Sequence, residues 1–131
     1  MTSEGAQLKR VLVVEDEPSI CRFCQRALTA EGFEVDTVGD GAGAQSLLRE
    51  KDYALCLFDI RIPVMDGKQL YQWVAEEYPQ LLGRVIFITG DLISGDTKSF
   101  LEQTGCPFLP KPFTLDELKT MVRKTLGQMG K

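Results

Sequence analysis

Short apolar runs alternate with longer amphipathic stretches along this chain. The apolar runs have the length of β-strands, and most are rich in the β-branched and aromatic residues that strands favour. They cover residues 10–14, 34–38, 53–58, 84–88 and 107–109. Between them, apolar residues recur every three or four positions, which places them on one face of an α-helix. The pattern therefore predicts five strands, each followed by a helix.

Helix-starting and helix-breaking residues support this division. Four candidate starts precede the amphipathic stretches: Pro18, Asp40, Asp66 and Thr114. Asp66 and Thr114 are each followed three positions later by Gln or Glu, which is the spacing of a capping box. We expect a helix over 66–78 that ends before Pro79 and another over 94–104 that ends at Gly105. The last helix is expected to bury one apolar face: Leu115, Leu118, Met121, Val122, Thr125 and Leu126.

Regular alternation of strands and helices is typical of an α/β fold with helices on both faces of a parallel sheet. Right-handed crossovers and the strand order 2-1-3-4-5 give the simplest arrangement, a doubly wound, flavodoxin-like (βα)5 fold. We expect one domain over residues 9–127, preceded by a flexible lead-in at 1–8 and followed by a short tail at 128–131.

Length and charge narrow the class of protein. A chain of 131 residues is the size of one domain with a real core. Its formal net charge of −4, from 15 basic and 19 acidic residues, argues against direct nucleic-acid binding by this domain. The chain has neither an apolar run long enough for a membrane span nor the apolar core of a signal peptide, so we expect a cytoplasmic protein without membrane contact.

Four cysteines occur in the chain, and no histidine. Cys21 and Cys24 form a C-x-x-C, which is compatible with a zinc site, a redox pair or two small apolar residues on a helix face. A zinc site would also need the isolated Cys56 and Cys106, and a second ligand pair is missing. Disulfides are rare in cytosolic proteins, which favours the core interpretation.

Chemically active residues follow four of the predicted strands. Glu15 and Asp16 come after the first strand, Asp59 ends the third, and Thr89 and Lys111 follow the last two. In a doubly wound sheet these ends meet at one edge, where ligands bind. Three carboxylates so close together need compensation, which Mg²⁺ and a lysine supply. This constellation suits a carboxylate that accepts a phosphoryl group.

The chain resembles the receiver domain of two-component response regulators from about residue 9 to residue 126. The matching segments are VLVVEDEP (11–18), DIRIPVMDG (59–67), FITG (87–90) and FLPKPF (108–113). The intervals of 30 residues from Asp59 to Thr89 and 22 from Thr89 to Lys111 also fit the family. The segment from residue 89 to 113 is especially similar to receivers at the C-terminus of hybrid sensor histidine kinases.

The resemblance implies a role for each residue of the site. Asp59 is implied as the phosphoacceptor, and Lys111 as the ligand of a phosphoryl oxygen. Mg²⁺ would be bound by Asp16 directly, by Glu15 through water, by Asp59 and by the backbone carbonyl of Arg61.

Two further residues are implied to form the switch. Thr89 would hydrogen-bond the attached phosphoryl group, and the aromatic side chain of Phe108 would rotate as Thr89 moves. Phe108 stands where the family more often has Tyr, just as Glu15 stands where it more often has Asp. We also expect Arg61 and Asp91 to pair across the mouth of the site and to slow dephosphorylation.

The family's phosphoryl donor is a phosphohistidine on a sensor histidine kinase or histidine phosphotransfer protein. Phosphoryl transfer and autodephosphorylation are self-catalysed in the family, so the resemblance implies no enzyme with a separate substrate. The switch would repack the face made by the fourth helix, fifth strand and fifth helix, where an output domain or partner would bind. The chain ends at Lys131 without room for an output domain, so a stand-alone receiver and a receiver from a longer protein both stay open.

Other classes fit less of the sequence. A thioredoxin-like redox protein would use Cys21 and Cys24, but Cys21 is expected inside a helix rather than at its N-terminus. A flavodoxin-like nucleotide binder would not place acidic residues in its first loop. A haloacid dehalogenase-type hydrolase needs a second Asp two residues after the first, where this chain has Arg61. A non-phosphorylated pseudo-receiver that acts as an interaction module also stays open.

Overall fold

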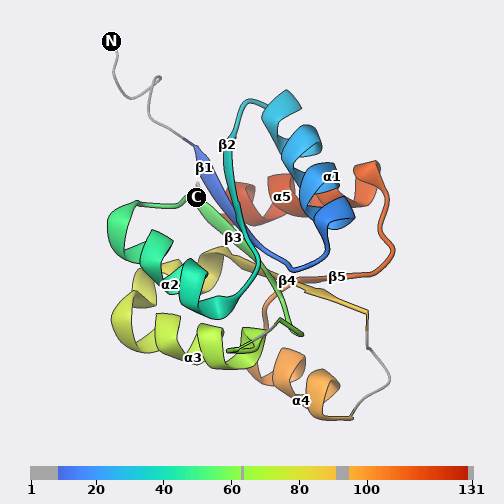
Figure 1. Cartoon of the computed structure of the whole chain (residues 1–131). Helices are drawn as coiled ribbons and strands as arrows, with labels where there is room; N and C mark the ends of the chain where they lie inside the picture. Colours follow the sequence, from blue (N-terminus) through green and yellow to red (C-terminus); the bar gives the residue numbers. More distant parts are fainter. Residues whose placement is uncertain (1–8, 63, 91–94, 130–131) are drawn as a thin grey trace.

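The computed structural model of this chain describes residues 9–62, 64–90 and 95–129. Strands and helices alternate along these ranges (Figure 1). The strands are β1 (Arg10–Val14), β2 (Glu34–Val38), β3 (Leu55–Asp59), β4 (Val85–Thr89) and β5 (Phe108–Pro110). The helices are α1 (Pro18–Ala30), α2 (Gly41–Glu50), α3 (Gly67–Glu77), the 3-10 helix η1 (Pro79–Arg84), α4 (Gly95–Thr104) and α5 (Leu115–Met129).

All strand pairs in the sheet are parallel, and the strand order is β2-β1-β3-β4-β5. The predicted doubly wound, flavodoxin-like fold is therefore confirmed. The lead-in at 1–8 lies outside the described residues, as do the last two residues of the expected tail. Helix α5 extends through Met129, two residues beyond the expected domain boundary at 127.

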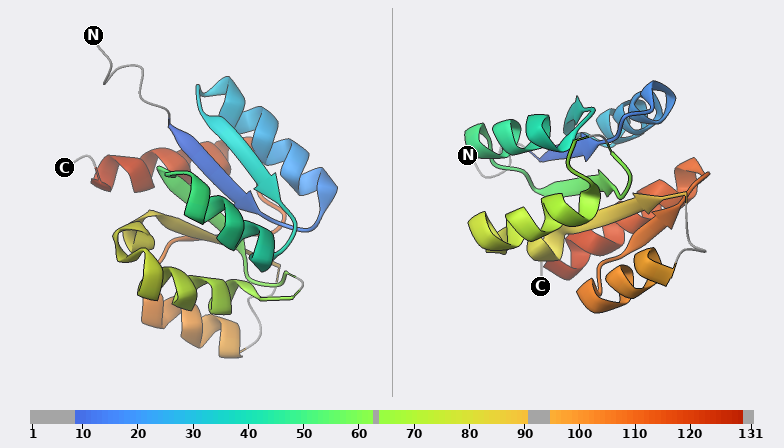
Figure 2. Two further views of the ribbon diagram at one scale, coloured as in Figure 1. Left: turned by 60° about the vertical axis from the view of Figure 1, so that its left-hand side comes forward. Right: turned by 60° about the horizontal axis from the view of Figure 1, so that its bottom comes forward.

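The sheet separates two apolar clusters, and each is covered by its own helices (Figures 1 and 2). Helices α1 and α5 pack on one face, where Leu28 and Leu118 are fully buried. Helices α2, α3 and α4 pack on the other face, against Phe58 and Phe87. Because successive strand residues point to opposite faces, the three central strands β1, β3 and β4 contribute to both clusters. Within the described ranges, no helix is long and apolar enough to cross a membrane.

Capping hydrogen bonds confirm three of the four predicted helix starts, and α1 begins at Pro18 as expected but without a side-chain cap. The Asp40 carboxylate accepts from the backbone N–H of Gly43 at 2.7 Å and caps α2. Asp66 and Gln69 form a reciprocal capping box at the start of α3. The second predicted box, at the start of α5, is also present, with contacts of 2.8 and 3.1 Å.

The third helix ends before Pro79, as expected, and the residues that follow, for which no element was predicted, form η1. Proline is compatible with the first turn of such a helix. One expectation about the last helix was wrong. Leu115 was expected on the buried face of the last helix, but its exposed fraction is 42%. It is the first residue of α5, and the helix turns its buried face toward the sheet only from Leu118 onward.

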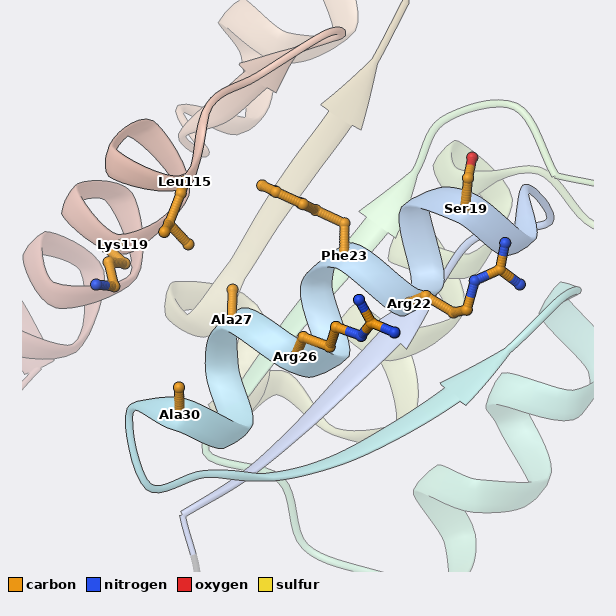
Figure 3. Close-up of a pocket in the computed structure, with 8 residues that line it drawn as sticks. All are labelled: Ser19, Arg22, Phe23, Arg26, Ala27, Ala30, Leu115 and Lys119. Atoms are coloured by element: carbon orange, nitrogen blue, oxygen red, sulfur yellow. The ribbon is translucent and has the colours of Figure 1, made fainter.

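Leu115 instead lines a groove of about 520 Å³ between α1 and α5 (Figure 3). Phe23 of α1 and Leu115 of α5 point into the space between the two helices. Arg22 and Arg26 also line the groove on the α1 side, and Lys119 lines it on the α5 side. The lining of the groove therefore includes both apolar and basic residues.

Gly67, the first residue of α3, allows this helix to start directly against the end of β3. A Cβ atom at this position would lie 2.4 Å from the carbonyl oxygen of Asp59 and 2.8 Å from the Cα of Ile60. The backbone N–H of Gly67 donates to the carbonyl of Ile60 at 2.8 Å. Asp59, the last residue of β3, therefore packs directly against the backbone at the start of α3.

We predict that Gly67→Ala lowers the free energy of unfolding by about 1–3 kcal/mol, because the added methyl group must displace backbone atoms. Gly83→Ala is the matched control, since a Cβ atom on Gly83 meets nothing within 4 Å. We expect this control to change stability by less than about 1 kcal/mol. Chemical denaturation of both variants measures the difference, and equal stabilities would contradict the close approach.

Candidate functional site

The carboxyl edge of the sheet brings the predicted site residues together. Strands β1 and β3 pair with Val14 opposite Phe58, so the next residues, Glu15 and Asp59, leave the sheet side by side. Strands β4 and β5 pair with Thr89 opposite Pro110, so Lys111 begins beside the end of β4. The parallel register alone thus delivers residues that lie far apart in sequence to one edge.

Backbone hydrogen bonds fix each of these positions. The N–H of Glu15 donates to the carbonyl of Val38 at 2.9 Å. The N–H of Ile60 donates to the carbonyl of Ile88 at 3.0 Å, and the N–H of Lys111 donates to the carbonyl of Thr89 at 2.8 Å. The site therefore sits on rigid strand ends rather than on a loop of its own.

The ammonium group of Lys111 joins three carboxylates. Its Nζ atom lies 2.6 Å from Glu17 Oε1, 2.8 Å from Asp59 Oδ2 and 3.0 Å from Glu15 Oε1. Asp59 and Glu15 are buried, with exposed fractions of 3% and 1%, whereas Glu17 is exposed. The second oxygen of Asp59 accepts a hydrogen bond from the backbone N–H of Arg61 at 3.0 Å.

The protonation behaviour of the site follows from this geometry. Burial and the hydrogen bond with Asp59 raise the pKa of Glu15 to about 7, although Lys111 acts in the opposite direction. Burial alone would lower the pKa of Lys111, but its carboxylate partners raise it, so the lysine stays charged. The site thus holds more negative charge than a single lysine can neutralise.

These residues fit a hard divalent cation. Carboxylate oxygens of Glu15, Glu17 and Asp59 lie within 4.8 Å of one another. Oε1 of Glu15 is buried and accepts no well-aligned hydrogen bond, although Lys111 Nζ is nearby. Mg²⁺ prefers oxygen ligands and usually takes one or two carboxylates from the protein. The cluster offers several carboxylate oxygens, and one of them, Oε1 of Glu15, is buried without a well-aligned hydrogen-bond donor. These are the kind of ligands that Mg²⁺ prefers.

A cavity of about 300 Å³ opens beside the phosphoacceptor candidate. The residues that line it are Asp16, Glu17, Asp59, Arg61, Gly90 and Lys111. Four of the predicted site residues therefore share one cavity, while Glu15 is buried behind it.

The predicted switch residues lie on the last two strands, β4 and β5. Thr89 is buried at the end of β4 and Phe108 is 37% exposed at the start of β5. The individual roles of the site and switch residues stay predictions. The expected partner of Arg61, Asp91, lies outside the described residues.

Glu17 is the residue that sequence reasoning missed. In the sequence it is one of several acidic residues of the first loop, yet its contact with Lys111, at 2.6 Å, is shorter than those of Asp59 and Glu15. A usable signal was present, because Glu17 immediately follows the two expected metal ligands and precedes the proline that starts α1. That position confines Glu17 to the mouth of the site.

Neither cysteine of the C-x-x-C pair has an activated thiol; Cys24 is buried and Cys21 is half-buried. Burial raises the pKa of Cys24 to about 12. Burial and the charges of Glu15 and Asp16 raise the pKa of Cys21, whose Sγ lies 3.1 Å from the carbonyl oxygen of Glu15. Redox-active cysteines need a lowered pKa. This geometry therefore weighs against the thioredoxin-like alternative and for the packing role.

Comparisons with known proteins agree with this architecture. The family model for the response regulator receiver domain matches residues 11–123. The transcriptional regulatory protein TctD of Salmonella typhimurium is 34% identical over 124 residues, which cover 92% of this chain and 54% of TctD. The response regulator receiver protein CpdR of Brucella abortus is 34% identical over 119 residues, 91% of this chain and 98% of CpdR. The chain thus spans about half of the first regulator and nearly all of the second.

Solved structures give the same result. The receiver domain of the sensor histidine kinase PA1611 from Pseudomonas aeruginosa, with magnesium in its active site cleft, has a TM-score of 0.81 at 28% identity and covers 92% of this chain and 99% of that one. A CheY-like receiver from Methanospirillum hungatei has a TM-score of 0.85 at 26% identity, with coverage of 95% and 98%. By family model, sequence relatives and fold, this chain belongs to the receiver domains of two-component response regulators.

Proposed function

We propose that Asp59 accepts a phosphoryl group from a phosphohistidine and that the resulting aspartyl phosphate changes the surface offered to a partner. The observation that carries this proposal is the placement of Asp59. Its carboxylate is buried at a strand end, faces a cavity of about 300 Å³ and contacts the ammonium of Lys111 at 2.8 Å. The Asp59 carboxylate as nucleophile, the Lys111 ammonium and a cavity large enough for a small anion are therefore found at the same place.

In the proposed step, a carboxylate oxygen of Asp59 attacks the phosphorus atom of the donor. A phosphorus–oxygen bond forms as the phosphorus–nitrogen bond of phosphohistidine breaks, and the leaving imidazole nitrogen takes up a proton. Lys111 binds a phosphoryl oxygen and stabilises the charge of the transferred group. The reaction is self-catalysed, and hydrolysis of the aspartyl phosphate resets the protein, so we do not propose a separate enzyme activity.

The proposal includes Mg²⁺, held by Glu15, Asp16, Asp59 and the backbone carbonyl of Arg61. When bound, this ion neutralises charge on the transferred phosphoryl group. The support comes from the buried, under-satisfied oxygen of Glu15 and from the magnesium described for the related Pseudomonas receiver.

The proposed output surface is the face formed by α4, β5 and α5. Thr89 would bond the phosphoryl group, and its movement would turn Phe108, whose ring is partly exposed on this face. Phe108 borders a cavity toward α4 and another toward α5, which leaves space for an alternative side-chain position. A change of local charge would thereby alter the packing of a surface that a linked domain or partner can bind.

A sensor histidine kinase or histidine phosphotransfer protein is the proposed donor, in the cytoplasm. The net charge of −4 supports a domain that does not itself bind nucleic acid. Membrane contact is not part of the proposal.

Incubation with acetyl phosphate and Mg²⁺ is expected to add a single phosphoryl group, seen as one adduct by intact mass. EDTA or Asp59→Asn should abolish the adduct, because each removes a required group. Asp52→Asn is the control, since this exposed aspartate precedes the same strand at its other end. If the protein neither forms the adduct nor binds Mg²⁺ and beryllofluoride, the pseudo-receiver alternative is favoured instead.

Binding of Mg²⁺ is expected to weaken as the pH falls from 8 to 6. The pKa of Glu15 is raised to about 7, so this carboxyl group takes up a proton below that pH and must lose it when the ion binds. One site of this kind gives up to about a tenfold change in affinity per pH unit. Titration calorimetry in two buffers measures the proton release, and a pH-independent affinity would argue against the role of Glu15.

Thr89→Ala should separate phosphorylation from the switch. We expect Asp59 to remain phosphorylated in this variant, while the change in hydrogen exchange of β5 and α4 that accompanies phosphorylation is largely lost. Thr37→Ala, an exposed threonine on the far edge strand β2, is the control. Equal exchange changes in wild type and Thr89→Ala would exclude Thr89 from the switch.

A further inference from the structure

The ammonium of Lys111 is already surrounded by carboxylates. Its Nζ donates hydrogen bonds to Glu17 at 2.6 Å and to Asp59 at 2.8 Å, and it forms an ion pair with Glu15 at 3.0 Å. A phosphoryl oxygen that binds Lys111 must therefore compete with these carboxylates for the ammonium.

The three carboxylates differ in how easily they can leave. Glu15 and Asp59 are buried, and a buried carboxylate that loses its cation pays a large desolvation cost. The side chain of Glu17 is 55% exposed, so water can solvate it as soon as it turns away. Glu17 is consequently the partner that an incoming anion replaces.

The backbone of Glu17 is anchored, so that only its side chain needs to move. Its N–H donates to Oε2 of Glu15 at 3.1 Å, and its carbonyl accepts from the N–H groups of Ile20 and Cys21. Glu17 occupies the N-cap position of α1 but makes no side-chain capping hydrogen bond. Its carboxylate is directed to Lys111 instead, 2.6 Å away, and its release leaves the start of the helix intact.

We propose that Glu17 is a specificity-determining residue that competes with the incoming phosphoryl group for Lys111 and thereby slows phosphorylation of Asp59. This inference rests on the proposed function of Asp59. The Glu17 carboxylate accepts a hydrogen bond from Lys111 that a phosphoryl oxygen would otherwise accept. The negative charge of Glu17 at the mouth of the cavity also repels an anionic donor. A donor protein that gives Glu17 another cation would remove this barrier, whereas a small anion cannot.

The test compares Glu17→Gln with Glu34→Gln. Glu34 is a close match, because its side chain is 56% exposed and pairs with Arg10 at 3.0 Å, but it lies at the opposite end of the sheet. Both variants remove one negative charge from the protein. The rate of adduct formation with acetyl phosphate and Mg²⁺, followed by intact mass, is measured for wild type and both variants.

We expect Glu17→Gln to react about two to five times faster than wild type, the range that the usual strength of an exposed ion pair permits. Its affinity for beryllofluoride, measured at saturating Mg²⁺, should rise by a similar factor, and its affinity for Mg²⁺ is measured separately because Glu17 belongs to the acidic cluster. Glu34→Gln should match wild type in all three measurements. Thermal unfolding of both variants checks that the fold is retained.

Three results would overturn the inference. Unchanged rates in Glu17→Gln would show that Glu17 does not compete for Lys111. A slower rate together with weaker Mg²⁺ binding would assign Glu17 to the metal. An equal acceleration in Glu34→Gln would reduce the effect to net charge. In each case wild-type protein still forms the adduct on Asp59, whereas failure of wild type itself would count against the proposed function.

Discussion

The ammonium of Lys111 allows two carboxylates to be buried together at the carboxyl edge of this sheet. Glu15 and Asp59 are both buried, and two carboxylates at such short range repel each other strongly. Lys111 contacts both and is itself held by the carbonyl of Thr89. The last strand therefore supplies the counter-charge for residues from the first and third strands. Any group that enters the site has to fit into this existing set of charges.

The scaffold turns that charge arrangement into a fixed geometry. Strands β1 and β3 pair so that Glu15 and Asp59 emerge side by side, and the backbone around Gly67 packs directly against the end of β3. Strand ends are more rigid than loops, and catalytic constellations depend on such rigidity. The parallel pairing of β1 with β3 and the close backbone approach at Gly67 thus position Glu15 and Asp59.

Much of this organisation could be predicted from the sequence. Strands and helices can be predicted from the periodicity of apolar residues and from helix caps such as Asp40 and Asp66, because these signals are local in the sequence. The convergence of Asp59 and Lys111 followed from topology, which places all parallel strand ends on one edge.

What could not be predicted depends on side-chain orientation. Leu115 follows the apolar pattern of its helix but is the first residue of that helix and is exposed. The sequence places Glu17 next to the expected metal ligands, but only the position of Lys111 in the structure shows which side chain it pairs with. Neither property is encoded by spacing along the chain, since each depends on where another element passes in space.

The division of the core into two apolar clusters has an evolutionary consequence. Side chains on the α1–α5 face of the sheet pack with one another and not with those on the α2–α3–α4 face, because the backbone of the sheet lies between them. A substitution on one face is compensated by neighbours on that same face. The packing on each face can therefore diverge at its own rate while the strand ends between the two faces stay unchanged.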